Sequence, residues 1–104
     1  MMDGKELREE IVKKLQTVYD RELPVNIWDL GLIYEVNIFP NNEVEIVMTL
    51  TTPNCPAAHS LPLDVENVVK EVEGVGKVSV EITWFPTWNK DMMSEEALLE
   101  LGFL

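Results

Sequence analysis

Apolar residues recur along the chain at two different spacings, and each change of spacing predicts where helices give way to strands. Near the start they recur every three or four residues, which is typical of a helix that buries one face. We expect this helix to begin at a capping pair, Asp3 and Glu6, and to end near Tyr19. Its buried positions are predicted to be Leu7, Ile11, Leu15 and Val18.

From residue 32 onward, apolar residues alternate with mostly polar ones, as they do in strands with one buried face. Two such stretches, 32–39 and 43–51, flank the turn sequence at 40–42, which is Pro-Asn-Asn. The short turn predicts an antiparallel hairpin. The positions expected to face the core are Leu32, Tyr34, Val36 and Ile38 in the first strand, and Val44, Ile46, Met48 and Leu50 in the second.

The helical spacing returns after the loop 52–56. Pro56 suits the first turn of a helix, whereas Pro62 does not suit a helix interior. The helix therefore begins either near Ser60 or at Pro56 with a kink, and we favour the earlier start. The glycines of 74–76 end it. Its buried positions are predicted to be Leu61, Val65, Val68 and Val72.

A third strand and a short final helix complete the pattern. The strand runs from Lys77 until Pro86 stops it, and the helix opens at Ser94 and ends at Gly102. The positions expected to be buried are Val78, Val80, Ile82 and Trp84 in the strand, and Leu98, Leu99 and Leu101 in the helix.

The element order is therefore helix, strand, strand, helix, strand, helix. We predict a two-layer α+β fold in a single domain over residues 1–104, with a three-stranded mixed sheet covered by helices on one face. The helix between the second and third strands predicts a crossover that places those two strands parallel.

The charge of the chain narrows the classes of partner. It has 19 acidic and 8 basic residues and a formal net charge of -11. Such a chain repels phosphate backbones and anionic lipids, so neither nucleic acid nor a membrane is an expected partner. No apolar run is long enough to cross a bilayer, and the first residues lack the order of a secretory signal.

Cys55 is the only cysteine and the first candidate for chemistry. A single cysteine excludes an internal disulfide and suits the reducing cytoplasm, where we expect the protein to act. It follows a strand and precedes a helix, where free N–H groups lower the pKa of a thiol and favour the thiolate that binds metal. The alternative is a buried apolar cysteine, which a loop between two prolines disfavours.

Threonines 49, 51 and 52 approach Cys55 from the end of the strand, and their hydroxyls can stabilise an anionic sulfur or ligand. Strand preference explains Thr49 better, whereas Thr51 and Thr52 remain open between the two interpretations. His59 offers Cys55 a base or a second metal ligand, although a surface histidine is the favoured interpretation.

Three acids, Asp20, Glu22 and Asp29, gather after the first helix. They suit a divalent metal or a paired acid and base, but in so acidic a chain solvated loop carboxylates are the plainer expectation. Trp84, Phe85 and Trp88 can form an exposed apolar patch for a partner, with Trp84 more readily placed in the core.

Several of these segments resemble the SufT/PaaD-like metal–sulfur cluster biosynthesis family. Residues 20–27 (DRELPVNI) and 29–34 (DLGLIY) resemble its opening signature, and 49–56 (TLTTPNCP) resembles its central cysteine motif. Residues 84–88 (WFPTW) and 92–97 (MMSEEA) resemble its closing segment. The segments keep the family's order over nearly the whole chain.

The resemblance implies the iron–sulfur cluster assembly type of fold and an accessory role in assembling iron–sulfur clusters or maturing iron–sulfur proteins. It implies that other assembly proteins or client apo-proteins are the partners, and that a transient iron–sulfur cluster or iron is the cargo. The implied functional site consists of Cys55, Thr51, Thr52, Asp20, Glu22 and Asp29, with Cys55 as the key thiol.

One cysteine cannot hold a cluster alone, because a cluster typically takes four thiolates. Cys55 must then share its cargo with a partner, a small thiol or a second copy, and an exposed edge strand allows a homodimer. Two rival functions remain at this point. One is a thiol-dependent hydrolase or redox enzyme with His59 as base, and the other is a pure interaction adaptor.

Overall fold

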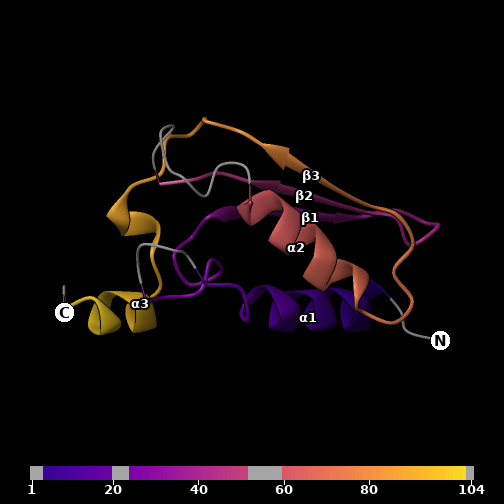
Figure 1. Cartoon of the computed structure of the whole chain (residues 1–104), viewed down its shortest axis with the longest axis horizontal. Helices are drawn as coiled ribbons and strands as arrows, with labels where there is room; N and C mark the ends of the chain where they lie inside the picture. The colour runs from indigo at the N-terminus through magenta and orange to yellow at the C-terminus, as the bar shows by residue number, and fades with distance from the viewer. Residues whose placement is uncertain (1–3, 20–23, 52–59, 103–104) are drawn as a thin grey trace.

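The structure is a computed structural model that describes residues 4–19, 24–51 and 60–102. Within these residues the elements follow the predicted order, with the short 3-10 helix η2 added before the last helix (Figure 1). They are α1 (Gly4–Leu15), β1 (Ile33–Ile38), β2 (Val44–Met48), α2 (Leu61–Lys70), β3 (Val78–Ile82), η2 (Lys90–Met92) and α3 (Glu95–Glu100).

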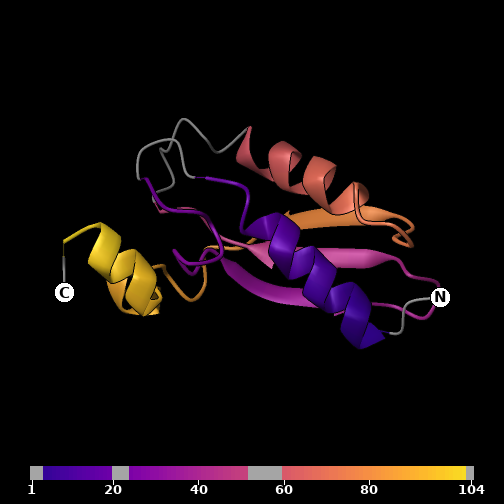
Figure 2. The same ribbon diagram turned by 90° about the horizontal axis from the view of Figure 1, so that it is seen from below.

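The sheet has the strand order β1-β2-β3. β1 pairs antiparallel with β2 across a turn at Asn42, whose φ of 63° is the left-handed conformation that asparagine tolerates. β2 pairs parallel with β3, as the crossover through α2 predicts. Both long helices lie on one face of the sheet, and Figure 2 shows α1 crossing β1 and β2 while α2 lies along β3. The two-layer fold class is therefore confirmed.

The core lies between the helices and the inner face of the sheet. The core members predicted from α1 and β2 are each at most 7% exposed, so both the helical and the strand spacing identified the buried positions of these two elements correctly. The members that α1 and β2 contribute are Leu7, Ile11, Leu15, Val44, Ile46 and Met48, with Val18 and Leu50 just beyond the ends of those elements.

The first helix ends at Leu15 rather than near Tyr19, so its predicted end is wrong. The amides of Thr17 and Val18 bond to carbonyls only three residues back, and the Thr17 hydroxyl donates to the Lys14 carbonyl at 2.6 Å. These tight bonds close the last turn, because they satisfy carbonyls that a longer helix would use. The predicted cap residue Asp3 lies outside the described residues.

The second helix begins at Leu61, next to its N-cap Ser60, which agrees with the later of the two predicted starts. Pro62 therefore falls in the first turn, where its missing N–H costs no helical bond, and no kink is needed. The start at Pro56 lies in 52–59, outside the described residues. Val69 rather than Val68 is fully buried, so that single position of the buried face was predicted wrongly.

Pairing of the third strand ends earlier than predicted, and this changes the place of Trp84. The last ladder bond runs from the Thr83 amide to the Met48 carbonyl at 2.9 Å, after which the chain leaves the sheet. Trp84 is consequently 39% exposed, and its predicted place in the core is wrong. Leu99 on α3 is 61% exposed and was also wrongly expected to be buried, because Ala97 fills that contact instead.

A β-bulge at Tyr34 shifts the side-chain alternation of the first strand. Ile33 pairs with Met48 and Glu35 pairs with Val47, so Tyr34 is an extra residue without a partner on β2. Tyr34 lines a groove together with Glu35 and Val47 on the outer face of the sheet. The helices α1 and α2 cover the other face (Figure 1). The prediction that Tyr34 faces the core is therefore wrong, because a strict period of two does not hold across a bulge.

Candidate functional site

Most of the predicted site falls outside the described residues. Thr51 and Asp29 are described, and no hydrogen bond or ion pair joins them in that part of the chain. The predicted residues that lie outside it are Asp20, Glu22, Thr52, Cys55 and His59.

Asp29 is held by reciprocal hydrogen bonds with Asn26. The Asn26 amide nitrogen donates to Asp29 Oδ2 at 2.8 Å, and the Asp29 backbone N–H donates to Asn26 Oδ1 at 2.9 Å. The Asp29 carbonyl also accepts a bond from the amide of Ser94, the N-cap of α3, at 2.8 Å. Asp29 therefore shapes the opening loop and docks the last helix.

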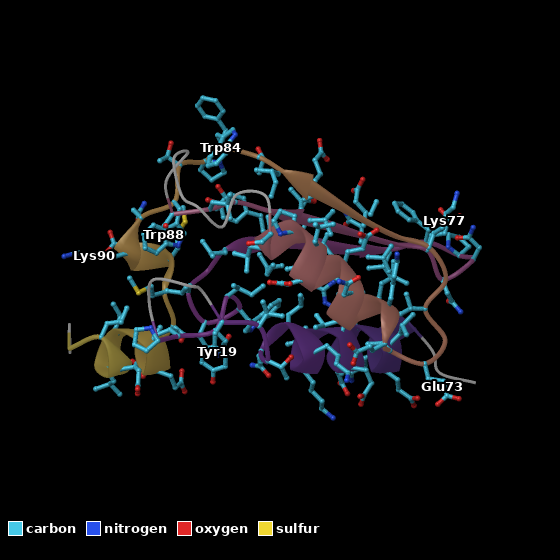
Figure 3. All side chains as sticks on the ribbon, in the orientation of Figure 1. Tyr19, Glu73, Lys77, Trp84, Trp88 and Lys90 are labelled. Carbon is cyan, nitrogen blue, oxygen red and sulfur yellow. The ribbon has the colours of Figure 1, made fainter. Side chains whose placement is uncertain are left out.

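The opening and closing segments meet at one end of the sheet, where β2 and β3 end. The indole N–H of Trp88 donates to the Leu30 carbonyl at 2.7 Å, and the Tyr34 hydroxyl donates to the Pro86 carbonyl at 2.6 Å. Figure 3 shows Trp84 and Trp88 at this end and Lys77 at the opposite end of β3. Segments far apart in the sequence are thus brought together here. Thr51 and Ser60 are the last described residue before the cysteine loop and the first one after it.

Gly31 allows the closest of these approaches. Its φ is +81°, and a Cβ placed on it would lie 2.3 Å from the carbonyl oxygen of Met92. Only glycine fits both the left-handed conformation and this space. The backbone of η2 therefore packs directly on the opening loop.

Tyr34 and Thr49 connect this junction to the central motif. Thr49 is 1% exposed, its amide donates to the Leu32 carbonyl, and its hydroxyl makes no hydrogen bond of normal geometry in the described structure. Burial raises the pKa of the Tyr34 phenol above its ordinary value, and the nearby Thr49 hydroxyl opposes that rise in pKa. The Tyr34 and Thr49 hydroxyls are therefore close polar neighbours that do not form a hydrogen bond of normal geometry.

The raised pKa of Tyr34 predicts a specific alkaline titration. The folded chain binds the phenolic proton more tightly than the unfolded chain does, so its stabilising contribution is complete below pH 10.0. It is lost as the pH rises from there through the folded-state pKa. In a Tyr19→Phe variant, which leaves Tyr34 as the only tyrosine, phenolate absorbance should appear at higher pH in the folded chain than in urea. Coincident titrations in the two states would contradict the burial of this phenol.

The described residues by themselves do not form a metal site. No group of three or more histidine, cysteine, aspartate or glutamate side chains is arranged there to hold an ion. None of the helices described is both long and apolar enough to span a bilayer. The sequence reasoning missed Tyr34, Gly31 and Met92 as residues that assemble this end of the sheet, although all three lie in or beside the segments that carried the family resemblance.

The fold and this junction define a small two-layer α+β domain in which the opening and closing segments meet at one end of a mixed sheet, with Thr49 of the central motif beside Tyr34. Comparison with known proteins then identifies the family. Residues 8–82 match the iron–sulfur cluster assembly protein family, and the chain belongs to it. The resemblance stated from the motifs is thereby confirmed.

Two relatives with assigned names cover most of the chain. A protein of Porphyromonas gingivalis named Fe-S protein maturation auxiliary factor is 57% identical over 92% of this chain and 91% of its own length. The Fe-S protein maturation auxiliary factor SufT of Staphylococcus aureus is 39% identical over 82% of this chain and 97% of its own length.

A crystal structure of a domain of unknown function from Bacillus anthracis has the same fold. It superposes with a TM-score of 0.89 at 36% sequence identity, covering 96% of this chain and 95% of that one. The fold assigned from the element order and the sheet topology therefore agrees with an experimental structure of a relative.

Proposed function

We propose that this chain is an accessory factor in iron–sulfur protein maturation, and that it acts through Cys55 rather than by catalytic turnover. The observation that carries the proposal is the family match over residues 8–82, together with relatives named as maturation auxiliary factors over nearly their full lengths. The junction of the opening and closing segments supports it, because hydrogen bonds and close packing join two of the segments that resemble the family's motifs.

In the proposed mechanism Cys55 binds iron or an iron–sulfur cluster only in transit. A thiolate is the form that ligates the iron of either cargo, and one thiolate leaves the other coordination positions to a partner. Thr51, Thr52, Asp20, Glu22 and Asp29 are the polar residues proposed to surround the cargo. The partners are other assembly proteins or client apo-proteins, and the reducing cytoplasm is the proposed compartment.

The experiment that tests the role removes the gene for this chain from its host. Enzymes that carry iron–sulfur clusters should lose activity while their polypeptides stay at normal abundance, because the defect lies in maturation rather than in synthesis. Re-expression of the wild-type chain should restore the activity. Iron–sulfur enzymes that keep full activity without the chain, under both iron-replete and iron-poor growth, would contradict the proposal.

A further inference from the structure

α1 and α2 lie on one face of the sheet and leave its outer face uncovered (Figure 1). One row of paired residues crosses this outer face from β1 to β3. Glu35 on β1 pairs with Val47 on β2, and Val47 pairs with Glu81 on β3. Val47 is 9% exposed yet does not belong to the main core, whereas both glutamates are exposed. The row therefore places an apolar residue between two carboxylates.

Among the described residues, the two carboxylates of this row have no cationic partner. Neither Glu35 nor Glu81 forms an ion pair within residues 4–19, 24–51 and 60–102. Their strands lie on either side of β2, so their Cα atoms are about 10 Å apart, two interstrand spacings. A lysine or arginine side chain that lies along Val47 can bury its methylene stem there and bring its charge near both carboxylates.

An apolar groove of about 630 Å³ adjoins the row. Its lining includes Ile33 and Val47 from the sheet and Pro86 and Met92 from the closing segment. The Tyr34 hydroxyl bonds to the Pro86 carbonyl and contacts Met92 Sδ at 3.6 Å, so the closing segment is fixed to the sheet rather than free to move away. The groove is therefore preformed, which lowers the entropic cost of filling it.

Two exposed aromatic residues extend this apolar surface. Phe85, which precedes Pro86 in the chain, is 82% exposed, and Trp84 is 39% exposed. Large aromatic side chains left in solvent beside a preformed groove are typical of interaction surfaces, where they act as anchors.

The charge around the groove determines what kind of molecule fits it. An isologous contact between two copies of this chain would place four glutamates, Glu35 and Glu81 of each copy, in one interface, and each copy carries a net charge of -11. An acidic or uncharged segment would leave both carboxylates unpaired. We propose that the outer face binds a segment of a partner protein in which a lysine or arginine lies close to an apolar side chain.

In this complex the apolar side chain occupies the groove and the basic side chain lies over Val47 between the two glutamates. The inference concerns partner binding alone and does not depend on Cys55. Its test measures peptide binding in solution. The docking proposal can therefore fail while the maturation role stands, and the maturation role can fail while the docking proposal stands.

The test is an NMR titration of the isotope-labelled full chain with short synthetic peptides. The probe peptide alternates arginine and leucine; a second peptide carries glutamate in place of arginine, and a third carries serine in place of leucine. Only the arginine–leucine peptide should shift the amide signals of Ile33, Glu35, Val47, Glu81 and Thr83. A double variant, Glu35→Gln with Glu81→Gln, should weaken its binding about tenfold.

The matched control replaces two exposed acids elsewhere, Glu9→Gln on α1 and Glu73→Gln, which Figure 3 places far from Trp84. This control should bind the peptide as wild type does, whereas Phe85→Ala should weaken it. Equal weakening by the control pair would show general attraction to an acidic protein and overturn the proposal. The absence of shifts at millimolar peptide would also overturn the proposal. Shifts of the same signals when the protein alone is concentrated would overturn it too, because they would assign the face to a second copy.

Discussion

Replacing Cys55 with serine is expected to abolish the binding of iron and sulfide by the purified chain. After anaerobic reconstitution in the presence of a small thiol that supplies the remaining ligands, the wild-type chain should retain iron and show the visible absorption of sulfur-to-iron charge transfer, and the Cys55→Ser variant should show neither. The physical reason is ionisation: a cysteine thiol has a pKa of about 8.5, lowered further near cations or helix starts, whereas a serine hydroxyl stays protonated and is a poor ligand for soft metals.

The control for this prediction is His59→Ala. If Cys55 acts as a ligand, removing the only histidine should leave iron retention close to wild type, since the proposed cargo is held by the thiolate and a partner. Equal loss in the two variants would instead indicate a cysteine–histidine unit, because residues that act together fail together. Both variants should unfold at the wild-type urea concentration, which separates loss of a ligand from loss of the fold.

Replacing Gly31 with alanine is expected to be the most damaging single substitution for the junction of the opening and closing segments. The added Cβ would lie 2.3 Å from the Met92 carbonyl oxygen, so either η2 or the opening loop must move. The left-handed φ of +81° adds about 1–2 kcal/mol on its own. Together these effects should lower the free energy of unfolding by about 3 kcal/mol or more.

Gly102→Ala is the matched control, since Gly102 has a φ of +82° but nothing within 4 Å of the added Cβ. It should cost only the conformational part, about 1–2 kcal/mol, in urea unfolding. Gly31→Ala should in addition change the fluorescence of Trp88, whose indole N–H bonds to the neighbouring Leu30 carbonyl. Equal unfolding midpoints for the two variants would contradict the close packing of η2 on the opening loop.

The layout of the fold was predictable because it follows from periodicity over several residues. The rows Leu7–Val18 and Val44–Leu50 each repeat one spacing without interruption, and every predicted member is buried. The parallel pairing of β2 with β3 also followed, since a helix connects those two strands.

What could not be predicted depends on single residues rather than on a repeat. The bulge at Tyr34 changes one step of an otherwise regular strand, and no local sequence signal marks it. Trp84 has the apolar character of a core residue, but its burial depends on where pairing with β2 stops. Ala97 buries against the core while the larger Leu99 does not, because the docking of Ser94 on Asp29 fixes the rotation of α3.

The candidate site was predictable in part. Asp29 was singled out from the sequence as a solvated or metal-binding acid, and the structure gives it bonds to Asn26 and Ser94 that the sequence did not indicate. The outer-face groove was missed, since it joins β1, β2 and the closing segment across more than 50 residues of chain, as the Tyr34–Pro86 bond does. The roles of Cys55, Thr51, Thr52, Asp20 and Glu22 remain predictions.

The most direct test of the central claim compares wild type and Cys55→Ser in a host strain that lacks this chain. Both are expressed to equal levels, and the activity of the host's iron–sulfur enzymes is measured together with iron incorporated into them. The wild-type chain should restore both quantities, and the serine variant should leave both at the level of the deletion strain. Full restoration by the serine variant would show that Cys55 is dispensable and would contradict the account.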